Sequence, residues 1–198
     1  MTRENIYRMA LLYFNISYDE MEPTSKERLF CEQFMDSAEE FCISQENWNF
    51  LMKRHDFSDD ERVIGSYMGL GYGYVLPVDF FKCCFVNDRY NIDFAIRGNE
   101  IYFASKNPSM DYIIGKLDYE NFNYPKTFAV LLSAQLAIKV SPMLAPDAQI
   151  EQRIASQYAI AFSQLQKNNQ DNRRIANPTS EEMVPPHGNT RYYREKFD

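Results

Sequence analysis

The chain has 198 residues and a net charge of −7, and 45% of its residues are apolar and 15% aromatic. This composition excludes disorder for most of the chain, and the length allows one domain with room for an inserted subdomain. No uninterrupted apolar run approaches the roughly 18 residues of a membrane span, and the N-terminus has no signal-peptide pattern. We therefore expect a folded protein without a membrane partner.

The negative charge is concentrated at one end of the sequence. Residues 1–61 carry 14 acidic and 6 basic side chains, residues 62–166 carry 9 of each, and residues 167–198 carry 5 and 6. Nucleic-acid binding needs clustered lysine and arginine, so this distribution predicts no sequence-specific binding of DNA. The acidic region fits a solvated helix face, or a wall that repels passing DNA.

Two helices are predicted in the acidic region. Thr2 can cap a first helix that runs to about Asn15, and a capping box of Thr24 and Glu27 begins a second that reaches Ile43. The apolar stripe expected on the second helix is Leu29, Phe30, Phe34, Ala38, Phe41 and Cys42. The opposite, exposed face is expected to carry Glu32, Asp36, Glu39 and Glu40.

The one tryptophan follows these helices. We expect Trp48 and Phe50 to form a plug between the helical layer and the next part of the chain, because an isolated tryptophan in apolar surroundings usually packs. The four cysteines form no CxxC pair. Cys31 and Cys42 lie on one face of the second helix, which favours reduced, buried thiols over a disulfide or a metal site.

The middle of the chain is predicted to form a small antiparallel meander. Residues 77–80 predict a short turn before a strand over 81–86, and apolar residues alternate with polar ones over 90–97. Gly98 and Asn99 predict a tight hairpin turn, after which the chain returns over 100–104. A further strand is expected over 111–117.

Two amphipathic helices are expected next. Pro125 suits the first position of a helix, and Pro142 and Pro146 are expected to break the chain before a last helix that ends near Gln166. The short connection predicts that these two helices pack antiparallel.

The composition changes after Gln166, where asparagine and proline become frequent and too few apolar residues remain to offset the entropy of ordering. The last residues regain aromatic and basic character in Arg191, Tyr192, Tyr193, Arg194 and Phe197. These residue types are enriched at interface centres, so the pattern predicts an arm that docks on a partner. The alternative is a frayed chain end.

These patterns predict an α+β fold that is mainly α. Residues 1–61 form the N-terminal helices of a four-helix bundle, 62–120 an inserted antiparallel β-hairpin or meander module, and 121–166 the closing helical pair. Residues 167–198 form an extended C-terminal arm.

No recognisable catalytic or cofactor pattern occurs in the sequence. The two histidines, His55 and His187, have no nucleophile nearby in sequence, and phosphate-binding, metalloprotease and paired-cysteine zinc motifs are missing. We expect a protein that is not an enzyme and holds no metal or cofactor.

The order of these features resembles the head–tail adaptor proteins of short-tailed phages, closest to the tail tubular protein A group. The resemblance rests on Trp48-Asn49-Phe50, on Leu76-Pro77-x-Asp79 before a hairpin, and on Pro125-x-x-Phe128 opening an alanine- and leucine-rich helix. It covers residues 1–166.

The resemblance implies a virion protein, made in the host cytoplasm, that forms a homo-oligomeric ring, commonly of twelve copies, beneath the portal. In that family the helical part surrounds the DNA exit channel, the hairpin module meets neighbouring tail proteins and the C-terminal arm docks on the portal. Applied to this chain, the resemblance implies that the acidic face of the second helix lines the channel, through which DNA passes without sequence-specific binding. A cytosolic, non-catalytic module that recognises a peptide or regulates a partner is the alternative that shares this composition.

Overall fold

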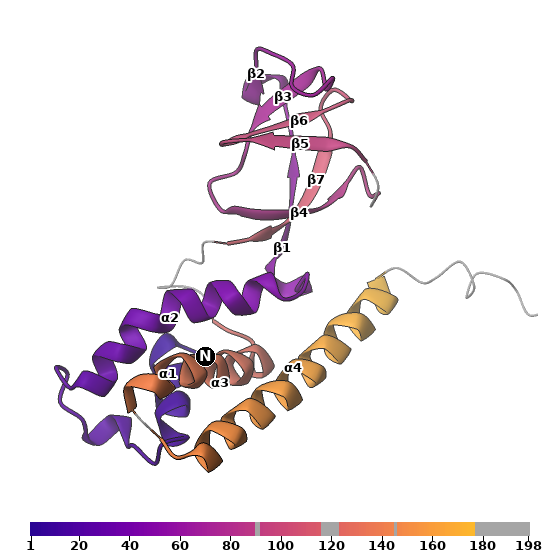
Figure 1. The fold of residues 1–198 in the computed structure, drawn as a ribbon. Coiled ribbons are helices and arrows are strands. Elements are labelled where there is room, and N and C mark those ends of the chain that lie inside the picture. Colours follow the sequence, from indigo (N-terminus) through magenta and orange to yellow (C-terminus); the bar gives the residue numbers. More distant parts are fainter. Residues whose placement is uncertain (90–91, 116–122, 145, 177–198) are drawn as a thin grey trace, which may run out of the picture.

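The computed structural model describes residues 1–89, 92–115, 123–144 and 146–176, and the side chains up to residue 170 within those ranges. Figure 1 shows two parts, a domain of helices below and a β module that stands on one end of it. We call residues 1–51 and 123–176 the helical domain and residues 52–115 the β module. The α+β fold expected from the sequence is confirmed.

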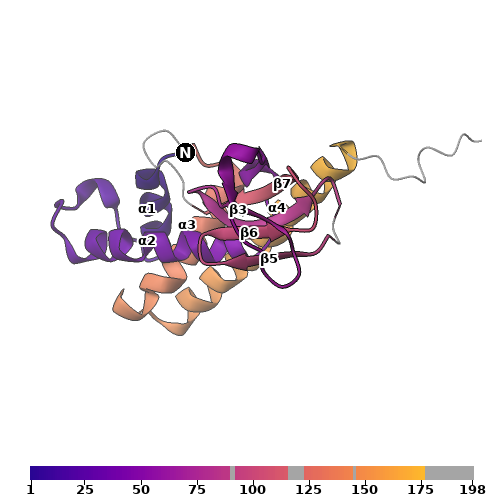
Figure 2. The same cartoon turned by 90° about the horizontal axis from the view of Figure 1, so that it is seen from above.

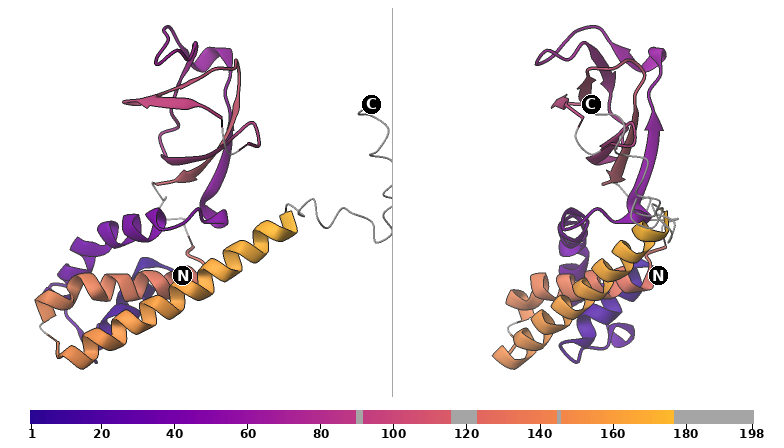
Figure 3. Two further views of the ribbon diagram at one scale, coloured as in Figure 1. Left: turned by 45° about the vertical axis from the view of Figure 1, so that its right-hand side comes forward. Right: turned by 90° about the vertical axis from the view of Figure 1, so that its right-hand side faces the viewer.

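Four helices build the helical domain: α1 (Arg3–Leu12), α2 (Lys26–Ser44), α3 (Lys126–Leu144) and α4 (Ala148–Ala176). Three single turns of 3-10 helix, η1 (Tyr18–Glu20), η2 (Asn49–Leu51) and η3 (Asp59–Glu61), lie in the connections. Helix α3 packs against each of the other three, and α3 and α4 run antiparallel side by side as expected (Figure 3). Seen from above, the β module covers one end of the domain and leaves α1 and the start of α2 beside it (Figure 2).

The β module contains two antiparallel sheets. One has the order β1 (Met52–Asp56), β7 (Ser109–Ile114) and β4 (Phe80–Val86). The other has the order β2 (Arg62–Val63), β3 (Tyr72–Val75), β6 (Glu100–Phe103) and β5 (Phe94–Arg97). The ring of Phe57, just after β1, lies 4.9 Å from that of Tyr74 and 5.5 Å from that of Phe103, which joins the first sheet to the second.

Two predictions about the β module are wrong, namely that it is a single meander and that it begins at residue 62. Strand β1 belongs to the module and pairs along its whole length with β7, from Met52 opposite Ile113 to Asp56 opposite Ser109. This pairing joins residues more than fifty positions apart, and no local pattern encodes it. The predicted β5–β6 hairpin is confirmed, and Gly98 at its turn has a φ of +61°.

Helix α2 is rotated relative to the expected stripe. Cys31, Met35, Ala38 and Cys42 are fully buried and follow each other at helical spacing, whereas Leu29 and Phe41 are exposed. The capping box is also wrong, because the N-cap is Ser25, whose hydroxyl accepts the Arg28 N–H. The two cysteines are buried and free, as expected. Because α2 lies against α3 with its cysteine side, the apolar residues at the edge of the stripe face outward.

Two helix ends also differ from expectation. Pro142 does not end α3, since the helix continues to Leu144 with the proline in its last turn, at the cost of the hydrogen bond to the carbonyl four residues back. Helix α4 does not end near Gln166 but continues to Ala176, so the expected arm over 167–198 begins as helix. The rest of that arm, with all five expected docking residues, lies outside the described residues.

Within the described ranges, one helix is long and apolar enough to span a membrane by length and composition alone, namely α3. The relevant stretch has a mean hydropathy of 1.5 and includes the polar Ser133 and Gln135, so it is not an uninterrupted apolar run. In the fold, 61% of that stretch is buried inside the helical domain. Helix α3 is therefore the core helix of the bundle.

The loop between β2 and β3 ends in a turn that holds a methionine in an unusual conformation. Tyr67 and Leu70 exchange both backbone hydrogen bonds across Met68 and Gly69, whose φ values are +51° and +82°. This is a two-residue hairpin turn of the I′ kind, which favours asparagine or glycine at the first position. Met68 is 78% exposed there, so little packing offsets the strain of its left-handed backbone.

Replacing Met68 with asparagine should stabilise the protein. Asparagine tolerates the left-handed conformation, and the gain is about 1 kcal/mol, or roughly 2–4 °C in Tm for a chain of this size. Differential scanning calorimetry measures it. Ile64→Asn, at a fully exposed residue of the same loop without a positive φ, is the control and should change Tm little. A Tm for Met68→Asn at or below wild type would contradict the strain argument.

Candidate functional site

The four acidic residues predicted to share an exposed face of α2 separate in the structure. Glu32, Asp36 and Glu40 are exposed, but Glu39 is only 3% exposed. The expectation for Glu39 is therefore wrong, because the rotation of α2 turns it toward α1 and the start of α3. The guanidinium of Arg28 pairs with Glu32 at 3.4 Å, so even the exposed face is partly neutralised.

Glu39 lies in a polar joint between three segments. Its Oε2 pairs with the Arg3 guanidinium of α1 at 3.0 Å, and its Oε1 accepts the Tyr124 hydroxyl hydrogen bond at 2.9 Å. Arg3 also pairs with Asp36 at 2.6 Å. Burial raises the pKa of Glu39 above its ordinary value even though Tyr124 and Arg3 oppose the shift. Burial beside this carboxylate likewise raises the pKa of Tyr124.

The joint forms one wall of a cleft of about 330 Å³ between α2 and the β module. The lining residues are Asp36, Glu39, Glu40, Val78, Phe80, Phe81 and Gly115. A Cβ atom on Gly115 would lie 2.8 Å from Cβ of Phe81, so this contact requires glycine. The cleft brings three of the four predicted carboxylates to the boundary between the two parts of the molecule.

Glu39→Gln should make stability less dependent on pH. A carboxyl whose pKa is raised by folding binds its proton more tightly in the folded state, so its contribution is favourable at low pH and is lost as pH rises through the folded pKa. The free energy of unfolding of Glu39→Gln minus that of wild type should therefore rise with pH from about 4.5, the ordinary value, and then level off. Urea titrations over a pH series measure this difference.

The exposed Glu32→Gln variant controls for the loss of one negative charge. A difference between Glu39→Gln and wild type that stays flat, or falls with increasing pH, would show that Glu39 is not held at a raised pKa.

Trp48 and Phe50 lie at the junction of the helical domain with β1. The Trp48 indole is fully buried, and its N–H donates to the Cys42 carbonyl at 2.8 Å. Its ring packs 6.2 Å from Phe128 of α3 and 6.1 Å from Phe162 of α4. Phe50 is half-buried beside it. The tryptophan is thus buried as expected, but its aromatic neighbours belong to the helical domain, so the expected position between that domain and the sheets is not what these ring contacts show.

One residue at this junction, Asn169, was not predicted from the sequence; it hydrogen-bonds to the backbone on both sides of Trp48. Asn169 of α4 is only 5% exposed, and its side chain accepts the Asn49 N–H at 2.8 Å and donates to the Asn47 carbonyl at 2.9 Å. An asparagine in a segment rich in asparagine resembles a solvated tail. A periodic signal did exist, because Asn169 follows Ile154, Ala161 and Leu165 at helical spacing on the buried side of α4.

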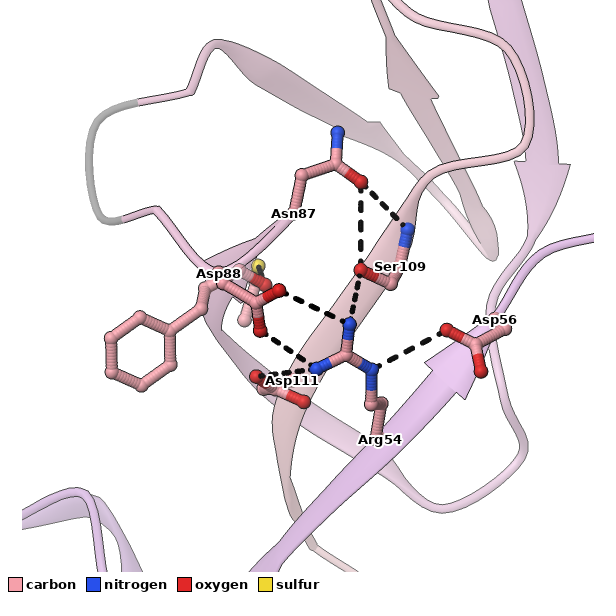
Figure 4. Close-up of polar contacts among 8 residues, drawn as sticks. Arg54, Asp56, Asn87, Asp88, Ser109 and Asp111 are labelled. Atoms are coloured by element: carbon pink, nitrogen blue, oxygen red, sulfur yellow. Dashed lines mark hydrogen bonds and ion pairs between the residues drawn. The ribbon is translucent and has the colours of Figure 1, made fainter. Parts of the chain in front are cut away.

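A polar cluster on the β module is centred on Arg54 (Figure 4). Its guanidinium pairs with Asp88 at 2.7 Å, donates to the Ser109 hydroxyl at 2.8 Å and lies near Asp56 and Asp111. Arg54 lowers the pKa of Asp88, whereas burial raises the pKa of Asp111 despite the nearby arginine. The contacts tie β1 to the turn after β4 and to β7. They give the cluster a structural role.

Replacing Arg54 with methionine should raise the pKa of both Asp88 and Asp111. Asp88 loses the hydrogen bond and charge that lower its pKa, and Asp111 loses the charge that opposes its burial. Carboxyl-carbon NMR titration measures both values. The matched control is Lys53→Met, which removes the neighbouring positive charge of β1 and the ion-pair partner of Asp79. It should leave the pKa of Asp88 unchanged. An Asp88 pKa that does not move in Arg54→Met would contradict this assignment.

A second cavity, of about 400 Å³, lies between α1, α3 and α4. Its lining residues are Met9, Leu12, Tyr13, Val130, Ser133, Arg153 and Gln157. Leu12 is 62% exposed at its edge, and the Arg153 guanidinium donates to the Tyr13 carbonyl across it. We call this cavity the helical groove. Its apolar lining is an unpartnered surface of the helical domain.

The titratable groups of the described residues form no arrangement for catalysis that we recognise. His55 lies in β1, where its Nε2 is 3.0 Å from Oε1 of Glu61 in η3 and its ring packs on Phe57. Burial raises the pKa of Cys31 and of Cys83 to about 12, which keeps these thiols protonated and unreactive. In this part of the chain no group of three or more histidine, cysteine or acidic residues could hold a metal ion.

The predicted docking residues Arg191, Tyr192, Tyr193, Arg194 and Phe197 lie beyond Ala176, outside the described part of the chain. The candidate surfaces are thus the acidic cleft, the helical groove and the junction at Trp48 and Asn169. Comparison with known proteins finds no matching family model and no matching curated protein.

Proposed function

We propose that the protein is a structural subunit of the head-to-tail connector ring of a short-tailed phage. Copies would encircle the DNA exit channel beneath the portal and join the capsid portal to the tail, without catalysis. The order of sequence features that resembles this adaptor group is the origin of the proposal. Ring closure requires each subunit to present two different surfaces, one to each neighbour.

The observation that supports this proposal best is an unpartnered apolar surface on the chain. This surface is the helical groove, with Leu12 and Val130 exposed at its edge. On the β module, Ile64 and Val78 are almost completely exposed on its loops, but single exposed apolar residues are ordinary. A contiguous apolar surface such as the helical groove is what marks a subunit that is covered by a partner.

The acidic face of α2 is the candidate channel wall, with Glu32, Asp36 and Glu40 as the residues proposed to face DNA. Glu39 is excluded from that role by its burial. Arg28 and Arg3 already pair with two of the exposed carboxylates, so the repulsion would be modest. It would act within a Debye length of about 10 Å at moderate salt, enough to keep DNA from adhering.

Residues Arg191, Tyr192, Tyr193, Arg194 and Phe197 are proposed as the portal-docking anchors. Because α4 continues to Ala176, the deletion that tests this role should begin at residue 177 and leave the helix with Asn169 intact. Ordering a long arm on a partner is entropically costly, so few, well-buried aromatic anchors should carry the binding.

Deletion of residues 177–198 should abolish binding to the portal protein encoded by the same genome and leave the far-ultraviolet circular dichroism of the body unchanged. Light scattering on the mixture with the portal measures assembly. In the full-length chain, combined replacement of Tyr192, Tyr193 and Phe197 with alanine should give the same loss. Portal binding by the truncated protein would refute the docking role of residues 177–198. Absence of a large assembly when the wild-type protein is mixed with the portal would refute the proposed ring.

A second candidate is a cytosolic, non-catalytic binding module that recognises a peptide or regulates a partner. The helical groove favours it, since apolar grooves between helices accept the apolar face of a partner helix. This candidate predicts a monomer alone and with the portal, so the same light-scattering measurement separates the two.

A further inference from the structure

Four consecutive residues between α2 and β1 are each held by a specific contact. Glu46 accepts a hydrogen bond from Gln166 of α4 at 3.2 Å, Asn47 and Asn49 bond to Asn169, and Trp48 is buried beneath them. We call residues 46–49 the linker. Its backbone leads directly from the helical domain into the first strand of the β module.

Asn169 makes the most demanding of these contacts. Its amide group pairs with the linker backbone on both sides of Trp48, accepting from the Asn49 N–H and donating to the Asn47 carbonyl. The Asn49 side chain donates in turn to the Asn169 carbonyl at 3.0 Å. An asparagine side chain used in this way replaces the pairing that a neighbouring strand would supply. Loss of the buried amide would remove both of these hydrogen bonds from the linker at once.

Among the described residues the helices pack mainly on helices and the strands on strands, so the two parts share little backbone contact. The turn η2, which begins at the last residue of the linker within the helical domain and leads into β1, packs against α4. The cleft at Glu39 and Phe81 separates the rest of α2 from the β module. The linker is therefore the described segment best placed to set how the β module stands on the helical domain.

We propose that Asn169 is a latch that fixes the β module on the helical domain by holding the linker against α4. With the latch closed, α4 and β1 move as one body. With it open, the chain becomes a hinge between Trp48, which stays buried in the helical domain, and Met52, where β1 begins. The latch itself depends on no ring or portal.

Asn169→Ala tests the latch, and the neighbouring Asn168→Ala is the matched control. Asn168 is exposed and its side chain makes no bond to the linker, whereas alanine suits a helix at both positions. Hydrogen exchange of the Asn49 backbone amide, followed by NMR, should speed up at least about tenfold in Asn169→Ala and stay close to wild type in Asn168→Ala.

Residual dipolar couplings provide the second readout. In wild type and in Asn168→Ala, the helical domain and the β module should fit one common alignment tensor. In Asn169→Ala each part should fit its own tensor with unchanged internal couplings, which shows a hinge and not unfolding. Asn169→Asp keeps the size of the side chain but turns a carboxylate oxygen toward the Asn47 carbonyl, so it should open the hinge as well.

The proposal is overturned if the Asn49 amide stays protected from exchange in Asn169→Ala. It is also overturned if the two parts still fit one common alignment tensor in both Asn169→Ala and Asn169→Asp. It is equally overturned if Asn168→Ala matches Asn169→Ala in both readouts, since the effect would then not belong to the latch. All of these measurements use the isolated full-length chain, so they stand apart from the assembly test of the connector ring.

Discussion

The burial of one indole ring determines how the two parts of this protein meet. Helix α2 ends at Ser44, so the Cys42 carbonyl is among the last four of the helix, which have no partner within it. The Trp48 N–H donates to that carbonyl, which satisfies both groups at once and lets the ring enter the core without an unpaired donor. The chain must then turn outward toward β1, and Asn169 supplies the hydrogen bonds that this turn requires.

Helix α3 imposes the complementary constraint on the helical domain. It packs against α1, α2 and α4, and most of its surface is buried, so each of the other helices turns an apolar side toward it. The apolar residues that remain outside this arrangement are those on the helix edges and on the loops of the β module. On the helical domain, the surface open to a partner is therefore set by what the packing on α3 leaves uncovered.

Charge in the acidic region is organised by the same packing. Arg3 draws Asp36 and Glu39 together where α1, α2 and the start of α3 meet, so one of the carboxylates forms part of the interior. On the β module, Arg54 joins β1 to the turn after β4 and to β7 in a comparable way. In both places an arginine connects its own element to acidic side chains of other elements: Arg3 joins α1 to α2, and Arg54 joins β1 to the turn after β4 and to β7.

The sequence by itself determined part of the local structure, but not the cap of α2 or the ends of α3 and α4. Helical spacing predicted the burial of Cys31 and Cys42, the tolerance of Gly98 for positive φ predicted the β5–β6 turn, and the isolated Trp48 predicted a buried indole. Only the tertiary structure decided the rest: the rotation that buries Glu39, the position of β7 between β1 and β4, and the role of Asn169. Periodicity describes one element at a time, whereas the face that is buried and the polar group that finds a partner depend on segments far away in the chain.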